Sequence, residues 1–330
     1  MKNKENKNVT QVRLFDIIQK GLPANALLVA KVSEALKIGL DAAYRRIRGT
    51  KPLSLEEAVT LCEHFGVSFE KELAYKEKMK FAFVPSELEN MTSYEAYAKE
   101  LAKITDKANL LPDCQIILSA ADIPAYHYSA YHEMTMFQLF SWHKNMYDYR
   151  GTYEDFSREY LNEDAMEYCA QIHANYQQIP SSEIWTDNTI DSMIKLITYH
   201  VEMEHFNDKK IPLTVAGQLF ELISTLHEWT KNGEKGEKKT PLKFYVSEID
   251  IGNTLLLFDN DHQKRCVIRL FTINGLNIND ERFCQEASNW LDSLIKRSTL
   301  ISGISTKVRP QFITAQKEKI QKLKNFIESF

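Results

Sequence analysis

The chain has 330 residues, and its shares of hydrophobic residues (44%) and charged residues (26%) are ordinary for globular proteins, which excludes a disordered or fibrous chain. Its longest apolar runs are about five residues, far short of the roughly 20 that cross a bilayer, and MKNKENKNVT lacks the apolar core of a signal peptide. The formal net charge of −4 argues by itself against a nucleic-acid-binding protein.

The charge is divided unevenly along the chain. Residues 1–80 contain 15 Lys and Arg against 10 Asp and Glu, a balance of +5, whereas the remainder contains 26 against 35, a balance of −9. A basic head on an acidic body is typical of a small module that binds an anionic partner.

The five cysteines are scattered and include no CxxC pair. Their spacing indicates reduced thiols rather than a disulfide framework or a zinc site. We therefore expect a cytoplasmic protein with no metal, no cofactor and no membrane partner.

Four helices are expected in the head. Apolar residues at helical spacing predict helices over 12–20 and 27–37, followed by a short cationic helix over 41–48 that ends at Gly49. Ser54 and Glu57 form the S-x-x-E pattern of a capping box, which predicts a fourth helix that closes at Gly66. Two helices about three residues apart, the second short and cationic, form a helix-turn-helix pattern.

The stretch VSEALKIGLDAAYRRIRGTKPLSLEEAVTLCEHFGVS, residues 32–68, resembles the Cro/CI-type (lambda-repressor-like, XRE) DNA-binding domain. The resemblance covers about the first 75 residues and is strongest in RIRGTKP and SLEEAVTLCEHFGVS. The sequence departs from the family where Lys37 replaces the turn glycine, Gly39 replaces the capping serine, and Arg46 occupies a usually apolar position. The resemblance implies a regulator that reads the major groove of double-stranded DNA.

Helical spacing assigns faces to the third helix. Ala43 and Ile47 are expected to point into the core, with the opposite face left for DNA. Residues early in a recognition helix lie nearest the base edges, and later residues reach phosphates. The expected base contacts are Leu40, Asp41, Tyr44 and Arg45, and the expected backbone contacts are Arg46, Arg48, Thr50 and Lys51. Asp41 has the alternative role of complementing the positive end of its own helix.

The rest of the chain is expected to form a larger regulatory domain. Helices are predicted at 87–111, 133–147, 153–175, 187–206, 213–231, 280–298 and 310–329. Short strands are predicted at 114–118 and 125–129, and three antiparallel strands at 242–251, 254–259 and 264–272, with a hairpin turn at 260–262. A short heptad seam in 87–111 favours packing on the body over a contact between protomers.

The predicted fold class is therefore mainly α. It comprises an all-α helix-turn-helix domain over 1–80, a linker or helix over 81–112, and a helix-rich α+β sensor and dimerisation domain over 113–330 with a small antiparallel sheet. The body also resembles the uncharacterised C-terminal halves of bacterial helix-turn-helix regulators around SEIDIGNT and STLISGISTKVR. That second resemblance names no ligand.

The body contains no GxGxxG, GxxxxGK[ST], HExxH or GxSxG motif, so we expect no enzyme. His200 and His205 are five residues apart, about 140° around a helix, and are expected to diverge rather than hold a metal. An aromatic and histidine-rich stretch favours either a satisfied core or a ligand pocket. The candidate pocket residues are Tyr126, His127, Tyr128, Trp142 and His143.

Three hypotheses follow. The leading one is a repressor-like transcription regulator that binds double-stranded DNA as a homodimer and whose body senses a small-molecule or protein effector. The second treats the head as a protein-interaction module without DNA readout. The third is a LexA-like self-cleaving repressor, because Ser192 lies in Ile-Asp-Ser-Met, although Ile190 replaces the glycine of the Gly-Asp-Ser-Met motif.

Overall fold

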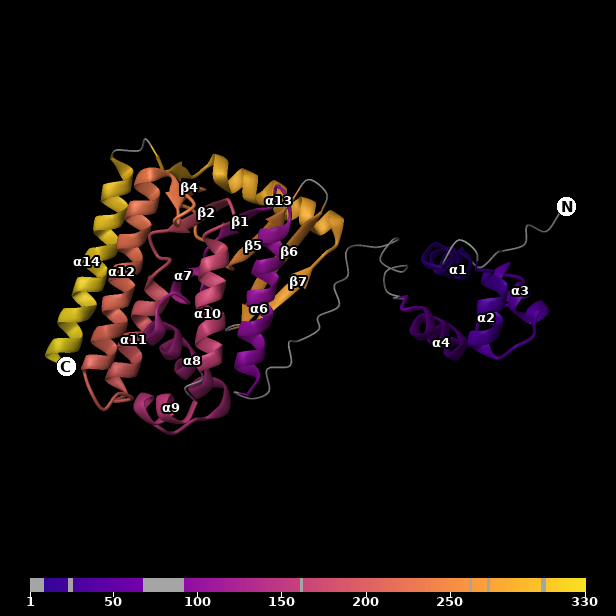
Figure 1. The fold of residues 1–330 in the computed structure, drawn as a ribbon, viewed down its shortest axis with the longest axis horizontal. Helices are drawn as coiled ribbons and strands as arrows, with labels where there is room; N and C mark the ends of the chain where they lie inside the picture. The colour runs from indigo at the N-terminus through magenta and orange to yellow at the C-terminus, as the bar shows by residue number, and fades with distance from the viewer. Residues whose placement is uncertain are drawn as a thin grey trace. The chain divides into compact units, whose positions relative to one another are not determined.

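The computed structural model describes residues 9–22, 26–67, 92–160, 163–260, 263–271, 274–303 and 307–330. The chain divides into two units, Met1–Ala82 and Phe83–Phe330, each with its own core (Figure 1). The expected linker at 81–112 contains a helix of the larger unit and residues outside the described ranges.

The described part of the smaller unit is a set of four helices. They are α1 (Val9–Gly21), α2 (Leu28–Leu36), α3 (Leu40–Ile47) and α4 (Leu55–Phe65), close to the predicted ranges. Both halves of the predicted capping box are present: the Glu57 amide donates to Ser54 Oγ, and the Ser54 amide donates to Glu57 Oε2, each at 3.1 Å. Lys37 in the turn between α2 and α3 has a φ of 52°, a left-handed conformation that glycine would adopt without strain.

A small apolar core holds these helices together. Leu14, Phe15 and Ile18 from α1 are buried against one side chain from each of the other three helices. These side chains are Val32, Ala43 and Leu61. Ala43 of α3 is one of them, as its helical position predicts, and Ile47 is partly buried at the edge of the same core. The α3 helix is thus fixed by one face, which leaves the opposite face in solvent.

The larger unit is built on a mixed sheet of eight strands. The strands are β1 (Gln115–Ser119), β2 (Ser181–Thr186), β3 (Glu234–Lys235), β4 (Thr240–Ser247), β5 (Leu255–Asp259), β6 (Lys264–Phe271), β7 (Asn274–Ile278) and β8 (Thr299–Leu300). Their order is β3-β4-β2-β1-β5-β6-β7, with β8 paired to β4. The pairs β4–β2 and β2–β1 are parallel, whereas β1–β5, β5–β6 and β6–β7 are antiparallel.

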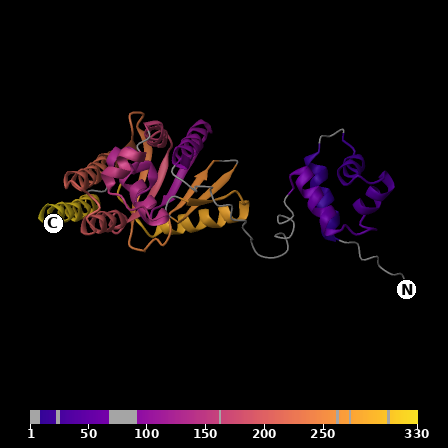
Figure 2. The ribbon, with the colours of Figure 1, turned by 90° about the horizontal axis from the view of Figure 1, so that it is seen from below.

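Helices cover both faces of this sheet. They are α6 (Thr92–Leu110), α7 (Ala125–Tyr128), α8 (His132–Tyr147), α9 (Tyr153–Tyr160), α10 (Glu163–Tyr176), α11 (Asp191–Glu202), α12 (Lys210–Asn232), α13 (Glu281–Lys296) and α14 (Val308–Ser329). Figure 2 shows α13 on one side of the sheet, opposite α6 and α10. None of the described helices is long and apolar enough to span a membrane.

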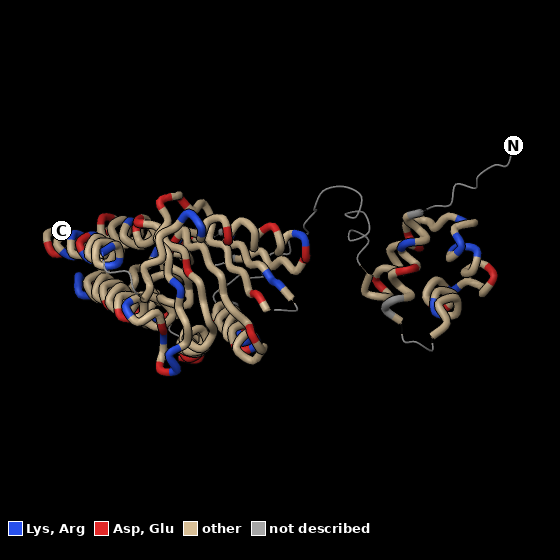
Figure 3. Tube along the Cα trace, turned by 90° about the horizontal axis from the view of Figure 1, so that it is seen from above, with Lys and Arg blue, Asp and Glu red and all other residues tan. Residues whose placement is uncertain are grey.

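The strands alternate between two cores. Ile116 and Leu118 of β1 pack in the core that includes α6 and α10, whereas Ile117 points to the core that includes α13. Successive strand residues point to opposite faces, so a strand covered on both sides is apolar at consecutive positions, as β1 is at Ile116, Ile117 and Leu118. Figure 3 shows that the charged positions of this unit lie mainly on its helices and loops.

The prediction of a mainly α protein with a small antiparallel sheet is wrong. The sheet has eight strands of mixed direction. The strands β2, β3, β7 and β8 were not predicted, and β4 pairs in parallel with β2 instead of joining β5. Parallel partners are separated by helical crossovers, so local periodicity does not reveal them. The β5–β6 hairpin is confirmed, although 261 and 262 of its predicted turn lie outside the described residues.

Two local predictions are also corrected. Residues 125–128 form α7 instead of a strand, because Pro124 caps the start of a helical turn and accepts from the His127 amide at 3.0 Å. The helix predicted at 187–206 covers only Asp191–Glu202, because residues 187–190 form a turn after β2 and Glu204, with a φ of 54°, turns the chain after the helix.

Candidate functional site

The first candidate site is the α3 surface, which we define as Leu40, Asp41, Tyr44, Arg45, Arg48, Thr50 and Lys51. All seven residues are exposed, with Leu40 at 59% and Tyr44 at 45% of full accessibility. Asp41 and Arg45 form an ion pair one helical turn apart. The Arg48 guanidinium carbon lies 4.6 Å from the centre of the Tyr44 ring, a cation–π contact. The structure therefore brings seven of the eight expected DNA-contacting residues onto one surface.

The loop that completes the α3 surface is held by Gln11 of α1. The buried Gln11 side chain donates from Nε2 to the carbonyls of Arg46 at 2.6 Å and Lys51 at 2.8 Å, and its Oε1 accepts from the Leu53 amide at 2.9 Å. Three hydrogen bonds from one side chain fix the backbone that presents Thr50 and Lys51. Sequence reasoning missed this role, because the partners of Gln11 are 35 to 42 residues away.

Arg46 does not belong to the α3 surface, so the structure does not present its side chain for the phosphate contact predicted from the sequence. Its side chain is 7% exposed, and its Nε donates to Glu57 Oε2 at 2.9 Å, with the neighbouring guanidinium nitrogen on the other carboxylate oxygen. The hydrogen bond from Arg46 is the main cause that lowers the pKa of Glu57, and the same bond raises the pKa of Arg46. The Glu57 carboxylate compensates the charge of the buried Arg46 guanidinium.

The remaining charges of the α3 surface are available to a partner. Arg48 and Lys51 form no ion pair within the ranges that the structure describes. Figure 3 shows Lys and Arg interspersed with Asp and Glu in the smaller unit, so its surface does not carry one sign of charge throughout. Any attraction for an anion therefore depends on a few local side chains.

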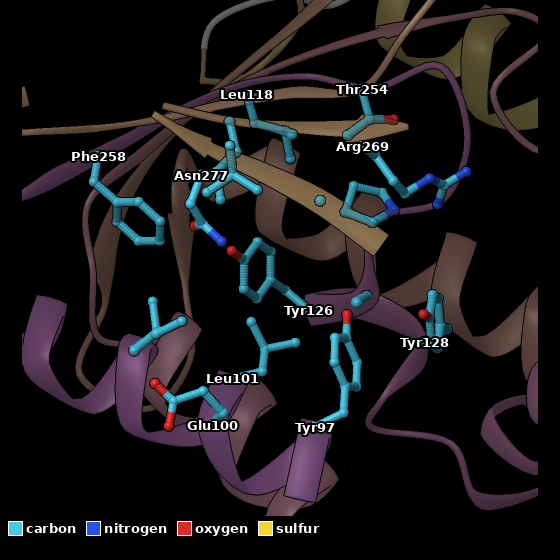
Figure 4. Close-up of a pocket in the computed structure, with 16 residues that line it drawn as sticks. Tyr97, Glu100, Leu101, Leu118, Tyr126, Tyr128, Thr254, Phe258, Arg269 and Asn277 are labelled. Carbon is cyan, nitrogen blue, oxygen red and sulfur yellow. The ribbon is translucent and has the colours of Figure 1, made fainter. Parts of the chain in front are cut away.

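The second candidate site is a cavity of about 180 Å³ in the larger unit, between α6, α7 and the strands β5 to β7 (Figure 4). We call it the α6–sheet cavity. Its wall is mainly apolar, formed by Leu101, Ile104, Leu118, Leu256, Phe258 and Val267. Its polar side chains are Tyr97, Glu100, Tyr126, Tyr128, Thr254, Arg269 and Asn277.

The five predicted pocket residues do not form one pocket. Tyr126 and Tyr128 line the α6–sheet cavity, whereas His127 between them is buried on the other side of α7. Consecutive helical residues point about 100° apart, so neighbours in sequence need not share a site. This part of the prediction is corrected.

Trp142 and His143 belong to an aromatic core, but not to the satisfied core of the other interpretation, because Trp142 Nε1 and His143 Nδ1 form no hydrogen bond with a described residue. The His143 ring lies 5.6 Å from Phe156 and 5.0 Å from Tyr160, measured between ring centres. Burial lowers the pKa of His143. The two residues are therefore packed away from the cavity that Tyr126 and Tyr128 line.

Behind α7, a buried carboxylate collects several donors. Glu183 of β2 is 0% exposed; Oε2 accepts from His127 Nε2 at 2.8 Å and from Trp185 Nε1 at 2.9 Å, and Oε1 accepts from the Tyr176 hydroxyl. Burial alone would raise the pKa of Glu183, but the His127 interaction, the Lys235 charge and the Tyr176 bond lower it to about 2. Glu183 is therefore a fully satisfied buried anion.

Lys235 is the cationic neighbour of this carboxylate. Its Nζ donates to Ser181 Oγ at 2.6 Å and lies 3.3 Å from the centre of the Tyr176 ring. Burial lowers the pKa of Lys235, and the charge of Glu183 opposes that shift. The sequence offered no signal for this cluster, because Lys235 lies in a charged segment that resembles a solvated loop.

His200 and His205 meet instead of diverging. The α11 helix ends at Glu202, and Glu204 adopts a φ of 54°, which turns the chain back. The two Nδ1 atoms are 2.9 Å apart, and His200 Nε2 lies 3.0 Å from Ser141 Oγ. Burial is the main cause that lowers the pKa of His200 to about 3. The described residues include no group of three or more metal-binding side chains.

Comparison with known proteins adds no identity to these sites: no family model matches the chain, and neither the curated proteins nor the solved structures contain a significant match.

Proposed function

We propose that the protein is a sequence-specific DNA-binding transcription regulator, in which the α3 surface reads the major groove and the larger unit senses an effector. The observation that carries the proposal is the exposed face of α3, which presents Tyr44, Arg45 and Arg48 while Ala43 holds the other face in the core. A short, fixed helix that follows another after a three-residue turn suits insertion into the major groove.

Arg45 is the proposed base-reading residue. Its partner Asp41 is one turn away, and both side chains are mostly exposed. An exposed pair of this kind contributes about 0.3–0.5 kcal/mol, whereas a bidentate contact with guanine discriminates by about 1–3 kcal/mol. Replacing the Asp41 contact of Arg45 with a contact to a guanine edge is therefore favourable. The Asp41 carboxylate is then free to accept a hydrogen bond from a cytosine amino group.

Arg48, Thr50 and Lys51 are the proposed phosphate contacts. They lie at the end of α3 and in the loop held by Gln11, and the Thr50 hydroxyl is anchored on the Arg45 carbonyl at 2.9 Å. Each cation that neutralises a phosphate contributes about 0.9 to the slope of log affinity against log salt concentration. Arg48 and Lys51 together should account for a slope of about −1.8 per protomer.

The protein is proposed to act as a homodimer on a two-fold symmetric operator, because one helix covers only a few base pairs. Selection of binding sites from random DNA with the full chain tests this directly. The expected product is a palindrome with a half-site spacing of about 10 base pairs or a multiple of it.

Two variants assign the contacts, and a third is their control. Arg45→Lys keeps the charge but loses the bidentate geometry, so it should relax base preference while retaining the salt slope. Arg48→Ala should weaken binding to all sequences equally and lower the salt slope by about 0.9. Lys296→Glu, an exposed charge change in the larger unit, is the control and should leave binding unchanged.

The proposal fails if the full chain enriches no sequence from the library and the variants bind DNA as the wild type does. That result, with the fold intact, would favour a protein-interaction role for the smaller unit.

A further inference from the structure

We propose that the α6–sheet cavity binds a small uncharged molecule with an apolar body about the size of an aromatic ring and one carbonyl-type acceptor, which receives a hydrogen bond from Tyr126. The regulatory meaning of this ligand, as the effector, rests on the proposed function. Its binding to the cavity does not depend on DNA.

The size of the cavity limits the ligand. An engineered apolar cavity of about 150 Å³ accommodates benzene. The α6–sheet cavity, at about 180 Å³, has room for such a ring and a short substituent. Leu101, Phe258 and Val267 come from a helix and two strands and give this space apolar sides, which favour a hydrophobic body.

The polar requirement comes from Tyr126. This residue is 5% exposed, yet no described residue forms a hydrogen bond with its hydroxyl. Figure 4 shows the Tyr126 ring standing among the lining side chains, with its hydroxyl on the side of Asn277. The hydroxyl faces the cavity, so an acceptor on a ligand that enters the cavity can receive its hydrogen bond.

The Tyr126 ring is held in place from behind. The ring stacks on that of Tyr176, with ring centres 5.1 Å apart and planes 13° from parallel. The backbone carbonyl of Tyr126 accepts a hydrogen bond from His173 Nδ1 at 2.6 Å. Tyr176 in turn donates to Glu183. Burial raises the pKa of Tyr126, so the phenol stays protonated and acts as a donor. The hydroxyl is therefore pre-oriented, which reduces the entropy lost on binding.

The charged groups of the cavity are already paired or exposed to water, which argues against a charged ligand. Arg269 forms an ion pair with Asp122, and the Thr254 hydroxyl donates to the same carboxylate at 3.2 Å. The Asn277 side-chain oxygen accepts from Arg265 at 2.9 Å. Glu100 is 63% exposed and stays in contact with water. A ligand with its own charge would meet no uncompensated opposite charge inside.

The ligand would also contact α6 of the larger unit. Tyr97, Leu101 and Ile104 of α6 line the cavity. In chain order α6 is the first described helix of the larger unit. A bound molecule therefore adds contacts to the first described helix of the larger unit.

Two isosteric probes test the proposal on the full-length protein. Acetophenone has a carbonyl where α-methylstyrene has a methylene group, so the pair differs only in the acceptor. By titration calorimetry, the wild type should bind acetophenone about tenfold more tightly than α-methylstyrene. Tyr126→Phe should abolish this difference and leave the affinity for α-methylstyrene within about twofold.

Two further variants complete the test. Tyr199→Phe removes an exposed hydroxyl elsewhere in the larger unit and should preserve the tenfold preference. Val267→Phe fills the cavity and should prevent binding of both probes, with retained folding checked by thermal unfolding. The proposal is overturned if the wild type binds neither probe at millimolar concentration, or if Tyr126→Phe keeps the preference for acetophenone.

The DNA-binding measurements are made without any probe, so the two proposals fail separately. Probe binding by a protein that selects no DNA sequence would support the cavity and refute the regulator. Sequence-specific DNA binding without probe binding would support the regulator and refute the cavity proposal.

Discussion

The carboxylate of Glu183, on β2 between β1 and β4, accepts from three donors, two of them on one oxygen. Glu183→Gln keeps the size of the side chain but removes its charge and replaces one acceptor with an amide nitrogen. Whichever way the amide is oriented, either Tyr176 or the pair of His127 and Trp185 faces a donor instead of an acceptor. Lys235 loses its buried counter-charge at the same time. The variant therefore breaks a buried network without creating a cavity.

The expected loss follows from the pKa of Glu183. That pKa falls from an ordinary value of 4.5 to about 2 in the folded protein, because the His127, Lys235 and Tyr176 interactions outweigh burial. At 1.36 kcal/mol per pH unit, the ionised carboxylate contributes about 3 kcal/mol to the free energy of unfolding at pH 7. Removal of one partner from a buried pair commonly costs about 3–5 kcal/mol, which agrees with this figure.

The sign of the pH dependence is set by the lowered pKa. The contribution of Glu183 to the free energy of unfolding is fully present above pH 4.5 and decreases as the pH falls towards 2. In this range Glu183 binds a proton in the unfolded chain before it does so in the folded protein. The stability of the wild type should therefore decrease over this window, and that of Glu183→Gln should decrease less. The two proteins should become more alike in stability as the pH approaches 2.

Urea unfolding followed by tryptophan fluorescence measures this effect. The four tryptophans all lie in the larger unit, so the signal reports that unit within the full-length protein. Glu237→Gln, a substitution at an exposed residue of the same region, is the control and should change the unfolding free energy by less than about 0.5 kcal/mol. A loss below about 1 kcal/mol for Glu183→Gln at pH 7, or a difference that stays constant down to pH 3, would refute the reasoning.

Two further predictions concern Arg46 and His200. Arg46→Met should destabilise α3 and α4 by about 2 kcal/mol, because the buried ion pair with Glu57 is lost. Amide hydrogen exchange measures this loss. A changed dependence of DNA affinity on salt concentration would contradict the placement of Arg46 away from the DNA. Because the pKa of His200 is lowered to about 3, this residue stays neutral in the folded protein while the unfolded chain binds a proton near pH 6.5, so stability should decrease as the pH falls from 6.5 towards 3. His200→Asn should reduce that decrease in the same urea assay, and an NMR titration of His200 with a midpoint above pH 6 would disprove its neutral state.

Much of the smaller unit was predictable because its signals are local. The Ser54–Glu57 capping box needs only four residues, and it is formed as the sequence predicts. Helical spacing placed Ala43 in the core. The same spacing predicted an exposed Arg46. This prediction failed because the burial of Arg46 depends on Glu57, 11 residues away on another helix.

The site in the larger unit was only partly predictable. Aromatic composition pointed to the stretch that contains Tyr126 and Tyr128, and both line the cavity. Their neighbour His127 faces the opposite way, towards Glu183, which no sequence pattern indicated. The direction of each side chain depends on α7, a single helical turn that was predicted as a strand.

The amino-acid sequence by itself determined the short-range features of this protein: the helices of the head, the polar face of α3, the β5–β6 hairpin and the uneven charge. These features rest on spacing and capping within a few residues, where one segment carries the whole signal. Only the tertiary structure decided the parallel pairing of β2 with β1 and β4, the enclosure of Glu183 and the space beside Tyr126. Each of these depends on segments far apart in the chain, whose contact becomes favourable only when the whole sheet and its covering helices assemble.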